Sequence, residues 1–150
     1  MSSNMVLEVK ELCKYFDVKG GIKGKQRVLA VDGISFEVKK GETFGLVGES
    51  GCGKSTLGRT ILRIYEPTKG KIFFEGQDIS GLSRKKMHAY RRKLQMIFQD
   101  PYASLNPRFT VGEIIEEPMV IHHMYTPEKR RQRVQELLEK NAQGAYAGAP

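Results

Sequence analysis

Residues Gly48 to Ser55 have the types and the spacing needed to bind a polyphosphate. The stretch reads Gly-Glu-Ser-Gly-Cys-Gly-Lys-Ser and fits the pattern G-x-x-x-x-G-K-[ST]. Glycines let successive backbone N–H groups point at phosphate oxygens without a Cβ in the way. The Lys54 ammonium can reach the β and γ phosphates, and the Ser55 hydroxyl is a suitable Mg²⁺ ligand. The sequence therefore predicts a phosphate cradle, formed by Gly48, Glu49, Ser50, Gly51, Cys52, Gly53, Lys54, Ser55 and Thr56.

The segments on either side of the cradle are those that such a site requires. Thr43–Gly48 is a short apolar run bounded by turn signals, which predicts a buried parallel strand. From Lys54 onward, Leu57, Ile61 and Ile64 fall on one helical face, and the positive end of that helix attracts anions. A flexible glycine loop that matches by accident is the alternative. The strand before and the helix after favour the cradle.

The rest of the chain predicts further strands and helices. Strands are expected at residues 6–12 and 34–42, with a glycine- and lysine-rich loop at 20–26 between them. Residues 66–78 read as turn, short strand and turn, and the apolar run at 94–98 reads as another strand.

Helices are expected in the last third of the chain. Thr110 and Glu113 fit a capping box at the start of a helix that Pro118 breaks or kinks. Thr126 and Pro127 predict the start of a second helix, whose apolar face holds Val134, Leu137 and Leu138.

Composition bounds the class of protein. A chain of 150 residues suffices for one domain, and its apolar runs are far shorter than a membrane-spanning helix needs. Cys13 and Cys52 show no metal-binding spacing, so reduced thiols are expected. The net charge of +8 suggests that the protein could bind nucleic acid. However, Met87, Tyr90 and Leu94 form an apolar helical face, which leaves the basic residues around them on a solvated face, and no nucleic-acid partner is expected.

Gln99 directly follows the apolar run at 94–98, where a side chain can reach the γ phosphate from a neighbouring strand. Taken with the cradle, the stretch Met96–Arg108 resembles the glutamine loop of ABC transporter ATPases, in the version found in oligopeptide, dipeptide and nickel importers. The resemblance implies that ATP and Mg²⁺ are the cofactors. It also implies that Gln99 is a catalytic residue that contacts the metal and orients water. It places Phe16 as the aromatic that stacks on adenine; Tyr15 is the neighbouring candidate, and an ordinary core aromatic is the alternative reading for Phe16.

The fold class expected from these features is α/β, a P-loop NTPase of the ABC ATPase type. Its core sheet is expected to be incomplete, with antiparallel N-terminal strands and the start of a helical subdomain. Residues 1–140 form the N-terminal part of the ATP-binding domain, with the cradle at 48–56, the glutamine loop at 99–108 and the helical subdomain from 110. Residues 141–150 are small and patternless, and are expected to be unstructured.

The resemblance implies the ATP-binding subunit of a peptide-type importer, which couples ATP hydrolysis to solute uptake. Its partners would be membrane permease subunits, a second ATPase subunit and, indirectly, an external solute-binding protein. Its location would be cytoplasmic, peripheral on the inner face of the cell membrane. The family's signature sequence, Asp-Glu strand and switch histidine do not occur in these 150 residues, so this chain is expected to bind ATP without turning it over. The alternatives are another P-loop kinase or NTPase, and a basic interaction protein that binds nucleic acid.

Overall fold

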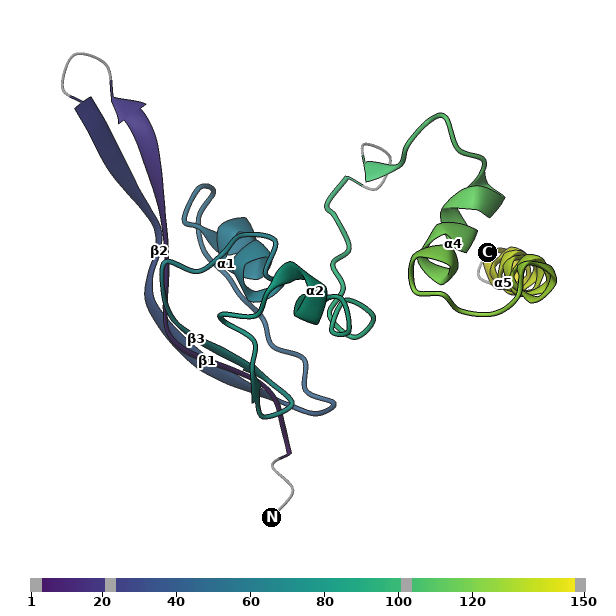
Figure 1. Ribbon diagram of the computed structural model, residues 1–150, viewed down its shortest axis with the longest axis horizontal. Coiled ribbons are helices and arrows are strands. Elements are labelled where there is room, and N and C mark those ends of the chain that lie inside the picture. Colours follow the sequence, from purple (N-terminus) through teal and green to yellow (C-terminus); the bar gives the residue numbers. More distant parts are fainter. Residues whose placement is uncertain (1–3, 21–23, 101–103, 148–150) are drawn as a thin grey trace. The chain divides into compact units, whose positions relative to one another are not determined.

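The computed structural model of this chain describes residues 4–20, 24–100 and 104–147 (Figure 1). These residues form two compact units, residues 1–96 and 97–150, and each unit is described by itself.

The first unit contains a four-stranded antiparallel sheet with the strand order β2-β1-β3-β4. Its strands are β1 (Met5–Gly20), β2 (Gly24–Lys39), β3 (Lys69–Phe74) and β4 (Gln77–Asp78). The two long strands β1 and β2 pair along their whole length, with irregular register between Met5 and Tyr15. Such irregularities bend and twist a strand pair, and Figure 1 shows the resulting curvature of β1 and β2.

Two helices of this unit, α1 (Lys54–Ile61) and α2 (Arg84–Met87), lie on the same side of the curved sheet (Figure 1). Apolar side chains from the strands, from α1 and from the segment around α2 form one core, which consists of Val9, Leu12, Val31, Leu57, Ile72, Phe74, Ile79 and Met87. Tyr90 and Leu94 pack against this core, as their spacing from Met87 predicts. The helix there is shorter than expected, because only residues 84–87 are α-helical and turns follow.

Two predicted strands are absent from the described part of the first unit and its boundary. Residues 43–48 and 94–98 are irregular, and Val47 and Ile97 are 94% and 95% exposed. A buried parallel strand takes its backbone hydrogen bonds from parallel neighbours. The sheet that the structure describes contains only antiparallel pairs, so these apolar runs have no such neighbour. The prediction of strands at these two positions was wrong.

Three other boundaries differ from the sequence prediction. The helix α1 ends at Ile61, and Ile64 lies beyond it, 47% exposed. The strands β1 and β2 extend into the expected loop at 20–26 and pair as far as Gly20 with Gly24, while residues 21–23 lie outside the described residues. Pairing with a neighbouring strand outweighs the weak strand preference of glycine and lysine.

The second unit contains the helices α4 (Val111–Ile121) and α5 (Pro127–Ala147). The predicted capping box at Thr110 and Glu113 is present, and α5 begins at Pro127 as predicted. The helix α4 continues through Pro118 to Ile121. No helix in the described residues is long and apolar enough to cross a membrane.

Residues 141–150 are expected from the sequence to be unstructured, and this prediction was wrong for residues 141–147. The helix α5 continues to Ala147, and residues 148–150 lie outside the described residues. Alanine has the highest helix propensity, and a helix needs no apolar face to satisfy its own backbone hydrogen bonds. The absence of an apolar pattern in residues 141–147 therefore does not mean the absence of a helix. On the expected apolar face of α5, Val134 is buried, but Leu138 is 41% exposed.

Candidate phosphate-binding site

The loop that precedes α1 is pressed against β2 at Gly53. Gly53 has a φ of 96°, in the left-handed region that side chains disfavour. A Cβ added there would lie 2.1 Å from the backbone oxygen of Ala30, which is closer than any real contact. Position 53 therefore accepts only glycine, for both its conformation and its space.

The other glycines of the motif meet different requirements. A Cβ on Gly48 would lie 2.7 Å from the Cys52 Sγ, so the two ends of the loop approach each other closely. Gly51 has a φ of 84° and open space around it, so it is required for its conformation alone. Together these features hold the loop in a tight turn.

The N-terminus of α1 is electropositive. Its first four N–H groups have no partner within the helix, and aligned peptide dipoles add partial positive charge there. The first turn contains no acidic residue, and the Gly53 N-cap makes no side-chain hydrogen bond. The first helical residue is Lys54, although a cation is disfavoured at this end of a helix. A local rule broken in this way is typical of a functional site, and here it favours an anionic ligand.

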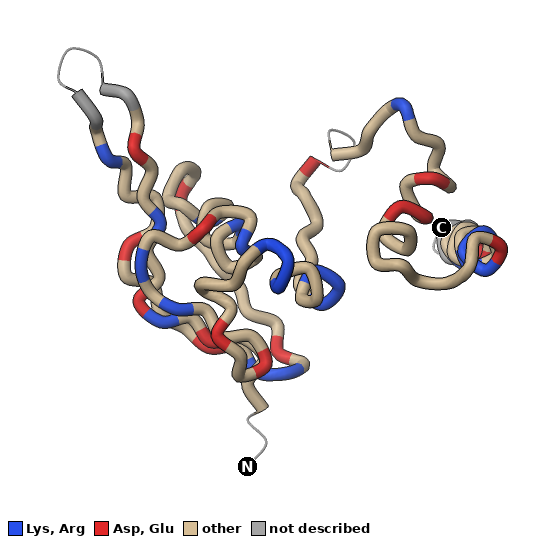
Figure 2. Tube along the Cα trace, viewed as in Figure 1, with Lys and Arg blue, Asp and Glu red and all other residues tan. Residues whose placement is uncertain are grey.

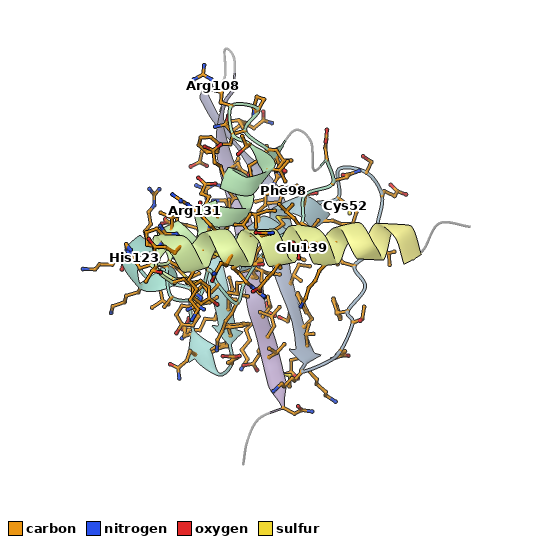
Figure 3. The ribbon with its side chains drawn as sticks, turned by 90° about the vertical axis from the view of Figure 1, so that its right-hand side faces the viewer. Cys52, Phe98, Arg108, His123, Arg131 and Glu139 are labelled. Carbon is orange, nitrogen blue, oxygen red and sulfur yellow. The ribbon has the colours of Figure 1, made fainter. Side chains whose placement is uncertain are left out.

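The Lys54 side chain folds back over the loop. Its Nζ donates hydrogen bonds to the backbone oxygens of Gly48 and Glu49, both at 2.6 Å, and lies 3.4 Å from the Cys52 Sγ. The ammonium is thereby held at the centre of the turn. Cys52, labelled in Figure 3, is exposed on this loop.

The residues that follow Lys54 fit the Mg²⁺ that accompanies a nucleoside triphosphate. Ser55 is exposed in the first turn of α1, and hydroxyl oxygen is a hard ligand of the kind Mg²⁺ prefers. Among the described residues, no three His, Cys, Asp or Glu side chains are grouped to hold a metal by themselves. A metal here would thus depend on Ser55 together with phosphate and water oxygens, as is usual for Mg²⁺.

A cleft of about 360 Å³ lies beside the cradle, between β2 and the start of α1. Its lining combines apolar and polar side chains, among them Leu29, Val31, Asp32, Cys52, Lys54 and Leu57. The sequence motif does not show that β2 forms the wall of the cleft opposite α1. The single sequence gives no signal for this packing of β2 beside the cradle, because the contact joins residues more than twenty positions apart.

The two aromatic candidates for base stacking, Tyr15 and Phe16, lie in β1 opposite Leu29 and Val28 of β2. Phe16 meets Tyr65 edge to face, with ring centroids 5.4 Å apart, and the Lys14 Nζ lies 4.8 Å from the Phe16 ring centroid.

The Tyr15 hydroxyl donates a hydrogen bond to the Asp32 carboxylate at 2.5 Å, and this bond raises the pKa of Tyr15. Asp32 lines the cleft beside the cradle, so this hydrogen bond places the Tyr15 hydroxyl next to a lining residue of the cleft. Stacking of a base on Phe16 remains a prediction.

Gln99 belongs to the second unit and is exposed there. Its approach to the phosphates, and its catalytic and metal-binding roles, therefore remain predictions. Part of the glutamine loop, residues 101–103, lies outside the described residues. The structure brings together the cradle residues 48–56 with β2.

A protein-family model described as ABC transporter matches residues 31–148 of this chain. Among curated proteins, the chain is 54% identical over 138 residues to the oligopeptide transport ATP-binding protein AppF of Bacillus subtilis, covering 90% of this chain and 42% of that protein. It is 44% identical over 146 residues to the dipeptide transport ATP-binding protein DppF of Haemophilus influenzae, covering 91% of this chain and 45% of that protein. The chain thus spans less than half the length of these relatives.

Solved structures are similar as well. The ATP-binding cassette MJ0796, in a dimeric post-hydrolysis state bound to ADP and Pi, matches with a TM-score of 0.73 at 25% identity, covering 89% of this chain and 56% of that one. The protein cbiO1 from Clostridium perfringens, part of the ABC transporter complex cbiONQ, matches with a TM-score of 0.68 at 30% identity, covering 93% and 51%.

Proposed function

Since this chain belongs to the ABC transporter family and has its ATPase fold, we propose that it is the ATP-binding part of a peptide importer. The relatives named for oligopeptide and dipeptide transport support the solute class. In this proposal the chain binds ATP with Mg²⁺. A longer protein that contains the chain couples ATP hydrolysis to uptake through membrane permeases and a second ATPase subunit. It works at the cytoplasmic face of the membrane, where ATP is present.

One observation carries the nucleotide part of the proposal. Lys54 stands at the electropositive start of α1, in a tight turn that requires the positive φ of Gly51 and Gly53, and no acidic residue of the first helical turn neutralises it. Backbone N–H groups and an ammonium that converge in this way recognise phosphate oxygens. The Lys54 ammonium exchanges its contacts with the Gly48 and Glu49 oxygens for phosphate oxygens when the ligand binds.

The roles of the residues follow from their places. The loop 48–53 orients the β phosphate through its backbone N–H groups, and Lys54 neutralises charge on the β and γ phosphates. The Ser55 hydroxyl would hold Mg²⁺, which would supply further neutralisation of the phosphate charge. Phe16 is proposed to stack on adenine. Phe16 pairs with Val28 of β2, and Gly53 approaches the backbone oxygen of Ala30 on the same strand. Val28 and Ala30 are two residues apart, so their Cα atoms are separated by about 7 Å along β2.

A competition experiment tests the nucleotide part. A fluorescent ATP analogue is bound to the 150-residue chain and displaced with ATP, adenosine or NAD. We expect ATP to displace it and adenosine to leave it bound, because the recognition lies in the triphosphate. Displacement by adenosine as effectively as by ATP would rule out the cradle as the principal site.

A chimaera tests the transport part. The matched segment of Bacillus subtilis AppF is replaced by this chain, and uptake of a labelled oligopeptide is measured in cells that lack the native protein. Uptake is expected with the chimaera and not with its Lys54→Ala variant. A folded chimaera that binds ATP but supports no uptake would contradict the transport role while leaving the nucleotide site intact.

A further inference from the structure

A second hollow of about 440 Å³ lies in the first unit, away from the cradle residues. Its walls come from the segment that follows α1 and from the segment around α2. We call it the arginine hollow and define it by its lining residues, Arg63, Ile64, Glu66, Leu82, Arg84, Met87, His88 and Arg91. Figure 2 shows the basic residues gathered along the α2 segment.

Two of its arginines are fixed by hydrogen bonds to backbone oxygens. Arg63 donates from Nε to the Ile79 oxygen at 3.0 Å and from Nη2 to the Leu82 oxygen at 3.1 Å. Arg91 donates to the oxygens of Leu62 and Arg63 at 2.6 and 3.1 Å. These carbonyl groups orient the two guanidinium groups but carry no net charge, so they leave the positive charge in place.

The charge of the hollow is not balanced by the protein. Among the described residues, no salt bridge joins Arg63, Arg84 or Arg91 to a carboxylate, and the Arg63 Nη1 is buried without a hydrogen-bond partner. Arginine stays charged at all accessible pH values, and partly buried charge without a counter-charge is costly. Against the three arginines, the lining contains one acidic residue, Glu66. The lining therefore carries two net positive charges when His88 is neutral.

The backbone at Arg63 points to the same conclusion. Arg63 has a φ of 55°, a conformation that glycine usually supplies just after a helix end. A side chain is disfavoured in this region because its Cβ approaches the following carbonyl oxygen. With this backbone, the Arg63 guanidinium bonds the Ile79 and Leu82 oxygens, which hold the positive wall of the hollow in place.

We propose that the arginine hollow binds a divalent oxyanion, either inorganic phosphate or the phosphate group of a monoester. Two net positive charges match a dianion, and guanidinium groups recognise phosphate with paired N–H donors. Arg84 is exposed and lines the hollow, so in this proposal its guanidinium supplies the donors that contact the phosphate oxygens. Arg63 and Arg91 supply a fixed positive field behind it.

Nuclear magnetic resonance of the ¹⁵N-labelled chain tests this site directly. The Nε–Hε signals of Arg63 and Arg91 are followed while inorganic phosphate or glycerol phosphate is added, with chloride holding the ionic strength constant. We expect saturable shifts with a midpoint in the low millimolar range. Saturation with phosphate alone would assign the free ion, and saturation with both would assign the phosphate group as such. The absence of saturable shifts with either would overturn the proposal.

Three variants separate the hollow from other sources of binding. Arg84→Ala should weaken the response about tenfold, as expected for loss of a charge-assisted hydrogen bond. Arg92→Ala removes the same charge from an exposed residue outside the lining, and should change the midpoint less than about twofold, since exposed pairs contribute little. Lys54→Ala should weaken phosphate binding at the cradle and leave the Arg63 shifts unchanged. Equal losses for Arg84→Ala and Arg92→Ala would show general charge attraction and would overturn the site.

Discussion

The Lys54 Nζ lies 2.6 Å from the backbone oxygen of Gly48. This hydrogen bond joins the lysine near the end of the phosphate motif to the first residue of the motif. The ammonium is already inside the loop, at the positive end of α1. Among the described residues, the Lys54 ammonium makes its hydrogen bonds within the loop, to Gly48, Glu49 and Cys52. We therefore expect its removal to have a large effect on ligand binding and only a small effect on the fold.

Lys54→Ala should weaken binding of a fluorescent ATP analogue at least tenfold, because the phosphates lose their one ammonium and keep only backbone donors. The matched control is Lys85→Ala, which removes an exposed lysine from the α2 segment. Circular dichroism checks that both variants are folded. Affinity unchanged in a folded Lys54→Ala variant would show that ATP binds elsewhere.

Gly53→Ala should destabilise the protein far more than Gly51→Ala. Both residues have positive φ, so each substitution carries a conformational cost of about 1–2 kcal/mol. At Gly53 the new methyl group also meets the Ala30 oxygen at 2.1 Å, whereas at Gly51 nothing lies within 4 Å. Urea unfolding followed by circular dichroism compares the two. Similar unfolding midpoints would mean that the loop does not pack on β2 as described.

Cys52 should react with iodoacetamide faster than Cys13, and MgATP should protect it. Cys52 is exposed on the loop, with its Sγ 3.4 Å from the Lys54 Nζ, so an alkylating reagent can reach it and a bound nucleotide would cover it. Cys13 is buried in the sheet, where its thiol approaches the Asp32 carboxylate and the Glu11 backbone oxygen at 3.6 Å. Peptide mapping after brief alkylation gives both rates. Earlier labelling of Cys13, or no protection of Cys52 by MgATP, would contradict the described loop.

The capping box of α4 should make that helix weaker in acid. The Thr110 backbone N–H, and secondarily its hydroxyl, donate to Glu113 and hold the pKa of this carboxyl below its usual value of 4.5. A lowered pKa means that the stabilisation is fully present above pH 4.5 and is lost as the pH falls through the lower value in the folded state. Protection of the Thr110 amide from hydrogen exchange, corrected for intrinsic rates, should follow this pH range. The Glu113→Gln variant should show no such dependence, and an identical profile in both proteins would refute the box as its cause.

The purified 150-residue chain should release phosphate from MgATP no faster than its Lys54→Ala variant. Hydrolysis needs the γ phosphate gripped, the metal held and a water positioned. In the proposed site, residues 48–56 would hold the phosphates, the Ser55 hydroxyl would bind the metal, and Gln99 alone is proposed to contact the water. Removal of one such group often costs about a hundredfold in rate. Hydrolysis of ATP at the ordinary enzymatic rate of about one per second would contradict this prediction.

Local sequence was sufficient where the physical requirement is local. The glycine and lysine spacing predicted the turn before Lys54 and the helix that starts there, because tight turns and helix starts depend on residues within a few positions of one another. The same holds for Thr110 with Glu113, and for Pro127 at the start of α5, both of which the structure confirms.

The tertiary structure decided what depends on distant partners. Apolar runs at 43–48 and 94–98 read as strands, but a strand exists only when neighbours complete its hydrogen bonds, and the described sheet provides none for them. Gly53 packs against Ala30, and the segment of Arg63 meets the segment of Arg84 and Arg91 around one hollow. In both cases the two segments are about twenty residues or more apart in the sequence. Sequence spacing carries no information about such contacts, because packing of the chain onto itself creates them.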